Sequence, residues 1–210
     1  MQELADGLWR WTARHAEWHP GEWGAQVASF ALDAGDVLLL VDPLVPDEDF
    51  LDPLVNGPVA ILITIPYHTR SAEPLSERYG AKIYGHPAVA KRLRKACVEP
   101  IDGELPGGAR AFPIGKPRRH ETPIHLPSHK ALAFGDSIVT TPEGELRMWH
   151  FDPVDDARKR WYRERFVPTL QPLRELSLQR ILVTHGEPVL SDGSAALEAA
   201  LEAPPWYRHG

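Results

Sequence analysis

The sequence predicts an α/β protein in which two mixed β-sheets stack between outer layers of helices, an αββα four-layer sandwich. A strand-rich N-terminal third is followed by a strand–helix–strand segment, a second strand-rich segment and a closing strand–helix unit. Three continuous apolar runs, Val37 to Val41, Val59 to Thr64 and Arg180 to Val183, predict central strands that are buried on both faces. No internal repeat or low-complexity linker divides the chain, so we expect one domain over residues 1–210.

The remaining strands are predicted from alternating or short apolar runs. A turn at residues 127–130, which contains Pro, Ser and His, separates the last two of them. These strands cover Gly7 to Ala13, Gln26 to Leu32, Lys82 to Tyr84, Ala109 to Phe112, Glu121 to Leu126 and Ala131 to Val139.

Four helices are predicted. The first begins near Ser71 and ends at Gly80, but Pro74 stands where a complete capping box has Glu or Gln. The others cover Pro87 to Lys95, Asp155 to Phe166 and Asp192 to Glu202.

Composition and charge limit the classes of partner. The net charge is −6, whereas a general nucleic-acid-binding protein needs a basic surface. The longest apolar runs are too short to span a bilayer, and the first residues lack the pattern of a signal peptide. The single cysteine, Cys97, excludes an internal disulfide. We therefore expect a cytoplasmic protein that binds neither nucleic acid nor membrane; its oligomeric state is left open.

Four motifs occur in an order that points to one fold. They are an early buried strand ending in Asp42-Pro43, the strand Ile61 to Thr64, the segment Leu132 to Asp136, and Ile181 to Pro188, which contains His185-Gly186. Together they span most of the chain and resemble the metallo-β-lactamase fold, an αββα sandwich of metallo-hydrolases. The resemblance implies a site where the strands end, at the edge at which open α/β sheets bind ligands.

The chain departs from that family at its first metal-binding motif. The family carries His-x-His-x-Asp-His after a strand that ends in Thr, whereas here the loop Ile65 to Ser71 reads IPYHTRS. In this loop His68 alone can bind a transition metal. Arg70 adds a permanent positive charge, which repels a metal ion.

The resemblance still implies a partial metal site. Asp136 matches the bridging Asp of the family and His185 its late His, and His120 fits the middle His by strand count. His129 competes for that place, but it falls in the turn at the far end of the hairpin. The set His68, His120, Asp136 and His185 would hold one zinc ion at most, or no metal.

Two functions follow from this reading. One is a weak mononuclear metal-dependent hydrolase of a small ester, thioester or phosphoester, with Asp136 or His68 orienting the water and Arg70 binding a substrate anion. The alternative is a non-catalytic pseudoenzyme that binds a small molecule or a protein partner. In both cases Trp18 and Trp23, from the loop over residues 14–24, are candidate ligand-binding residues or cover the sheet.

Overall fold

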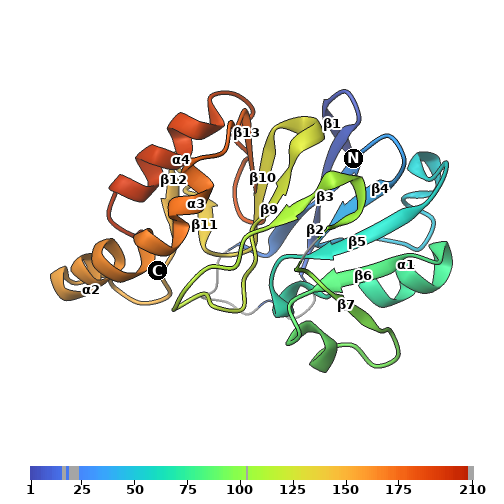
Figure 1. Ribbon diagram of the computed structural model, residues 1–210, viewed down its shortest axis with the longest axis horizontal. Coiled ribbons are helices and arrows are strands. Elements are labelled where there is room, and N and C mark those ends of the chain that lie inside the picture. Colours follow the sequence, from blue (N-terminus) through green and yellow to red (C-terminus); the bar gives the residue numbers. More distant parts are fainter. Residues whose placement is uncertain (16–17, 19–23, 103, 208–210) are drawn as a thin grey trace.

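The computed structural model describes residues 1–15, 18, 24–102 and 104–207, and these form two large sheets with helices on their outer sides (Figure 1). The first sheet has seven strands in chain order: β1 (Gln2–Ala5), β2 (Leu8–Arg14), β3 (Gln26–Asp33), β4 (Leu38–Val41), β5 (Val59–Ile63), β6 (Lys82–Gly85) and β7 (Val98–Pro100).

The second sheet has four strands in the order β13 (Arg180–Val183), β10 (Ala131–Phe134), β9 (Ile124–Leu126) and β8 (Arg110–Ala111). A separate hairpin consists of β11 (Ile138–Thr140) and β12 (Leu146–Met148).

The helices form the two outer layers. Helix α1 (Ala72–Tyr79) lies beside the first sheet, and α3 (Gln171–Arg174) and α4 (Gly193–Glu202) lie beside the second (Figure 1). Helix α2 (Asp156–Trp161) continues into a π-helical turn at Tyr162–Phe166. Short 3-10 helices occur at Asp52–Leu54, Pro66–His68, Val89–Lys91, Pro106–Gly108, Pro127–His129 and Val167–Leu170. Within the ranges described above, no helix is long and apolar enough to cross a membrane.

Three apolar clusters explain the four layers. Alternate residues of β4 point to opposite faces, so Leu39 belongs to the cluster between the sheets and Leu40 to the cluster under α1. Likewise, Leu62 faces the second sheet while Ile61 faces α1. A third cluster, which includes Leu132, Ile181, Leu173 and Leu197, fills the space between the second sheet and its helices. The predicted αββα sandwich is confirmed.

The position of β13 corrects one expectation. Like β4 and β5, this strand is buried, but it lies at the edge of its sheet rather than at the centre, with β10 as its ladder partner. Its outer side is covered by a bridge between Ile181 and Val189 and by packing against α4. Continuous apolar character therefore identified burial correctly but did not identify a central position.

Two further segments differ from the prediction because a glutamate carboxylate accepts hydrogen bonds from their backbone N–H groups. The helix predicted over Pro87 to Lys95 is reduced to the turn Val89–Lys91, since the Glu73 carboxylate accepts hydrogen bonds from the N–H groups of residues 94–96. The strand predicted over Ala131 to Val139 is divided at residues 135–137, whose N–H groups donate to Glu121. Glu121 itself lies outside the strand predicted to begin with it, because β9 starts at Ile124.

The start of α1 also differs in detail. Ser71 does not cap the helix with its side chain; instead its Oγ accepts a hydrogen bond from the N–H of Val45, 3.1 Å away. The predicted end at Gly80 is confirmed, and Gly80 has the left-handed φ of 63° that such an end requires.

Candidate functional site

Parallel strands bring the ends of four segments to one edge. β4 and β5 are parallel, so Asp42 and the loop after Ile63 emerge side by side. β10 and β13 are also parallel, which places Asp136 near His185. The two sheets are joined at this edge because the N–H of Ala28 donates to the carbonyl of Thr184, at 2.9 Å.

Asp42 organises the first-sheet side of the site. It follows β4 with a positive φ of 47°, and only 2% of its surface is exposed. Its Oδ1 accepts a hydrogen bond of 2.8 Å from the N–H of Thr64, and its Oδ2 accepts one from the Thr64 hydroxyl. The carboxylate is thereby fixed at the end of β5, where the chain turns toward His68.

His68 lies between two carboxylates. Its Nδ1 is 2.8 Å from Oδ2 of Asp42, and its Nε2 is 3.2 Å from Oδ1 of Asp136. Burial and the nearby Arg70 lower the pKa of His68, but the two carboxylates outweigh them, so this pKa lies above its ordinary value. The ring is therefore favoured as an imidazolium that bridges the two sheets.

Asp136 is presented by a second buried carboxylate, that of Glu121. The N–H groups of Gly135, Asp136 and Ser137 all donate to Glu121, at 2.8–3.2 Å, and the Ser137 hydroxyl donates at 2.6 Å. Burial, together with the charge of Asp136, raises the pKa of Glu121 to about 7. Burial also raises the pKa of Asp136, but His68 and His185 reverse that effect and hold it below its usual range.

His185 completes the second-sheet side. Its Nε2 lies 3.6 Å from Oδ1 of Asp136, at the end of β13. Burial lowers the pKa of His185 to about 4, although the Asp136 carboxylate opposes this. His185 is therefore a neutral imidazole at neutral pH, and its pKa is shifted in the opposite direction from that of His68.

Arg70 introduces a second cation into the cluster. Its Nη1 donates to the carbonyls of Ala28, at 3.0 Å, and Asp42, at 2.8 Å. Its Nε and Nη2 are shielded from solvent and have no hydrogen-bond partner in the part of the chain that the structure describes. Burial lowers the pKa of Arg70, and the charges of Asp42 and Asp136 counteract this. A guanidinium remains charged at any physiological pH.

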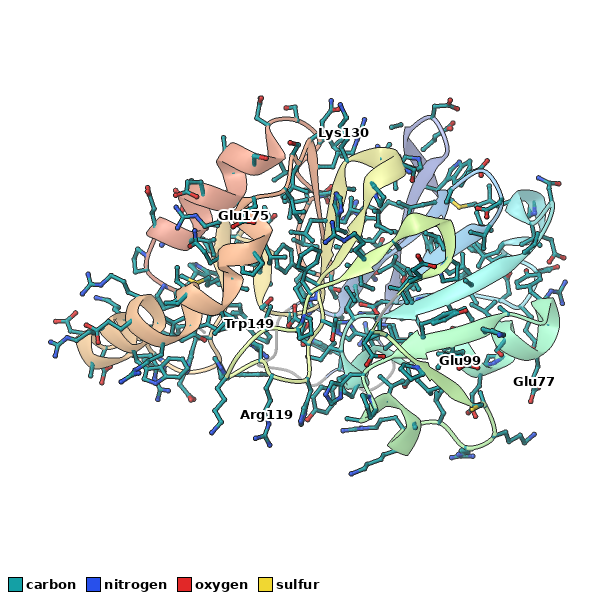
Figure 2. All side chains as sticks on the ribbon, in the orientation of Figure 1. Glu77, Glu99, Arg119, Lys130, Trp149 and Glu175 are labelled. Atoms are coloured by element: carbon teal, nitrogen blue, oxygen red, sulfur yellow. The ribbon has the colours of Figure 1, made fainter. Side chains whose placement is uncertain are left out.

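A cavity of about 270 Å³ opens beside these groups. Its polar wall contains His68, Arg70, Asp136 and His185. Its apolar wall contains four aromatic residues: Trp18, Tyr67, Trp149 and Phe151. Figure 2 labels Trp149 near the middle of the view, below Glu175 and above Arg119.

The mouth of the cavity combines aromatic rings with a cation. The rings of Trp149 and Phe151 lie 4.4 Å apart, centroid to centroid. The guanidinium of Arg118 lies over both rings, 5.1 Å from the Trp149 centroid and 5.6 Å from that of Phe151. A cation beside the buried Trp149 ring and the exposed Phe151 ring gives this rim both apolar and positive character.

The structure brings together most of the residues singled out from the sequence. His68, Asp136 and His185 converge, and Arg70 and Trp18 line the same cavity. His120 is not among the residues that line this cavity; it is exposed, and its ring packs 4.9 Å from that of His86.

Two other sequence-selected residues lie elsewhere. His129 lies in the hairpin turn, with its Nε2 3.2 Å from the carbonyl of Asp6. Trp23 lies outside the described residues.

Sequence reasoning missed two carboxylates that organise the site. Asp42 was noted as the end of a strand but not as a partner of His68, and Glu121 was assigned to a strand. Polar residues directly after buried strands are candidate site residues in α/β folds, so the position of Asp42 carried a signal. Glu121 carried no such signal, because its partners are backbone N–H groups fourteen to sixteen residues away.

No protein-family model matches the sequence, and no curated protein matches it. Solved structures do resemble it. A metallo-β-lactamase from Pontibacter korlensis has a TM-score of 0.64 and 15% identity, over 96% of this chain and 97% of that one. An archaeal metallo-β-lactamase superfamily protein from Sulfolobus tokodaii has a TM-score of 0.64 and 18% identity, over 93% and 85% of the two chains.

The chemotaxis sensor ODP, solved with a peroxy diiron species, has a TM-score of 0.58 and 14% identity, over 84% of both chains. The protein described here therefore has the metallo-β-lactamase fold. Metal-dependent proteins are found among its structural neighbours, and at these identities the likeness concerns the fold alone.

Proposed function

We propose that this chain is a non-catalytic protein of the metallo-β-lactamase fold that binds a small molecule in the cavity beside Asp136 without a metal ion. The observation that carries this proposal is the position of His68 between the carboxylates of Asp42 and Asp136, with Arg70 beside them. In this cluster two buried carboxylates lie beside an imidazole and a guanidinium.

Two features of the donor set oppose a transition-metal site. Nε2 of His68 faces Oδ1 of Asp136 at 3.2 Å, so a metal ion would have to replace this direct contact between the two side chains. Arg70 adds a fixed cation next to the same carboxylates, which opposes a divalent ion. Among the described residues, no group of three His, Cys, Asp or Glu side chains is arranged to hold a metal.

The cavity walls support a ligand with an apolar ring and an acidic group. Tyr67 is 63% exposed and Phe151 is 67% exposed, although large apolar side chains are ordinarily covered. Both lie at the cavity, where a flat apolar ligand would cover them. Arg118, over the rings of Trp149 and Phe151, would attract an anionic substituent. A volume of about 270 Å³ restricts the ligand to a small molecule.

The test is a ligand screen on protein purified without chelator and without added metal. Small aromatic carboxylic acids are added to labelled protein, and binding is followed by NMR shifts of the indole N–H of Trp149. We expect binding in the wild type and a loss of at least about fivefold in Phe151→Ser, since a stacked ring contributes roughly 1 kcal/mol or more.

Leu190→Ser is the matched control for this screen. Leu190 is another exposed apolar residue, at 39% exposure, and does not line the cavity. Its substitution should leave affinity unchanged. Equal affinity in the wild type and Phe151→Ser, or the absence of binding by any aromatic acid, would contradict the proposal.

A second candidate function is the mononuclear hydrolase of a small ester, thioester or phosphoester. One observation favours it: Oδ1 of Asp136 lies 3.2 Å from Nε2 of His68 and 3.6 Å from Nε2 of His185. Three ligands that share one metal at about 2.0–2.2 Å have similar separations. Elemental analysis distinguishes the two candidates, because one tightly held metal ion per chain, accompanied by ester hydrolysis, would replace the first proposal with the second.

A further inference from the structure

Arg70 is held in place by the backbone rather than by an acidic partner. Its Nη1 donates to the carbonyls of Ala28 in β3 and of Asp42 after β4. Two carbonyl acceptors from neighbouring strands fix the direction of the guanidinium and prevent it from turning toward solvent. The residue also has a positive φ of 39°, a conformation that costs free energy in a residue other than glycine. The fold therefore keeps Arg70 in this position despite a local cost.

The charge of Arg70 acts on all four ionisable groups of the cluster. The carboxylates of Asp42 and Asp136 favour the charged guanidinium, and the guanidinium in turn depresses the pKa of His68 and of His185. Arg70 also lines the same cavity as His68, Asp136 and His185. The cation therefore lies close to each side chain that could otherwise contribute a metal ligand.

We propose that Arg70 is a built-in cation that takes the electrostatic place of a metal ion and closes this site to metals. The proposal rests on the metal-free function proposed above and adds the residue responsible for it. The Arg70 guanidinium donates to the Asp42 carbonyl at 2.8 Å and lines the same cavity as His68, Asp136 and His185, so a divalent ion would enter a cluster that already holds a fixed positive charge. The shielded Nε and Nη2 of Arg70 are positive groups that no described acceptor satisfies, so they would repel such an ion directly.

Removing this charge while keeping the candidate ligands should create affinity for metal ions. Arg70→Gln retains an amide N–H₂ that can donate to a backbone carbonyl, and Arg70→Met retains most of the side-chain length. In either variant the two carboxylates, His68 and His185 remain. Arg70→Lys keeps the charge and is the matched control.

The experiment is a titration of each purified protein with Zn²⁺ and with Mn²⁺ by calorimetry, with bound metal counted by elemental analysis after desalting. The wild type and Arg70→Lys should retain less than about one tenth of a metal ion per chain. Arg70→Gln and Arg70→Met should each bind about one Zn²⁺, with affinity at least about 100-fold above wild type, because a unit charge a few ångströms from a divalent ion has a large effect. Near-ultraviolet circular dichroism checks that each variant is folded.

The outcomes separate this inference from the proposed function. A wild type that binds one metal ion tightly overturns both. A metal-free wild type whose folded Gln and Met variants also gain no metal overturns the role of Arg70 alone, and the ligand-binding proposal stands. If neither variant folds, the wild type is compared with Asp136→Asn. The inference is overturned if the wild type binds Zn²⁺ and this variant does not. It is supported if neither protein binds Zn²⁺ measurably.

Discussion

Nε2 of His68 lies 3.2 Å from Oδ1 of Asp136, and this ion pair joins the two sheets at the edge where the cavity opens. His68 follows β5 of the seven-stranded sheet, and Asp136 follows β10 of the four-stranded sheet. The pair therefore forms only when the sheets are packed in their native register, and it couples the integrity of the site to that of the fold.

Replacing Asp42 by asparagine should destabilise the protein by about 2–4 kcal/mol, measured by urea unfolding at pH 7. Asparagine tolerates the positive φ of 47° and can still accept the Thr64 N–H, but it leaves the buried His68 imidazolium with one carboxylate instead of two. Asp156→Asn, which removes a solvent-exposed pair with Lys159, is the control and should show no measurable change. Similar losses in the two variants would mean that the His68–Asp42 contact contributes little.

Glu121→Gln should destabilise the protein by about 2–3 kcal/mol, because a carboxamide offers one acceptor oxygen to four donors and turns its own N–H₂ toward them. The amides of Gly135, Asp136 and Ser137 should also exchange faster with deuterium, which native-state exchange followed by NMR would measure. Glu145→Gln changes a carboxylate on the exposed surface and should leave those amides protected. Unchanged exchange in Glu121→Gln would show that the turn holds without this carboxylate.

Gly135→Ala should cost about 1–3 kcal/mol of unfolding free energy, seen as a lower thermal midpoint. A Cβ at this position would lie 2.8 Å from the Thr64 Oγ1 and 3.1 Å from Cγ2 of Ile65, so either the first sheet or the Glu121 turn must move. Gly57→Ala is the matched control, because a Cβ there meets nothing within 4 Å. A Gly135→Ala variant as stable as Gly57→Ala would contradict the close contact between the two loops.

The two histidines beside Asp136 should titrate in opposite directions from their ordinary pKa of 6.5. The pKa of His185 falls to about 4, so its stabilising effect is complete above pH 6.5 and is lost as pH falls from 6.5 to about 4, by up to roughly 3 kcal/mol. The pKa of His68 is raised, so its contribution is complete below pH 6.5 and is lost as pH rises through the folded value.

Long-range proton–nitrogen NMR spectra of the imidazole rings would follow both titrations. His185 should stay neutral at pH 5.5, while His68 keeps its proton above pH 6.5. His185→Gln should abolish the loss of stability between pH 6.5 and 4 and leave the His68 titration in place. A His68 ring that is neutral at pH 6 would contradict the raised pKa of this histidine.

The pattern of apolar residues along the chain was sufficient to predict the αββα architecture. Alternate residues of β4 and β5 enter two different apolar clusters, and an uninterrupted apolar run is what such double burial requires. The strand ends at Asp42, Asp136 and His185 could also be located, because Asp42 directly follows a buried strand and each of the other two follows one after a single intervening residue. The loop after Ile63 contained one metal-binding side chain and an arginine, and both His68 and Arg70 are found at the site.

The tertiary structure decided which neighbouring side chains turn inward and what each one meets. His120 and Glu121 are adjacent in a segment without regular periodicity; the histidine packs on His86 at the surface, and the glutamate is completely buried beneath Asp136. The place of β13 at a sheet edge depends on pairing with Val189, which no strand pattern encodes. Residue types and strand ends are local properties of the chain. The bridge from Asp42 through His68 to Asp136 is not local. It exists because the two sheets pack face to face and place three distant segments within hydrogen-bonding distance.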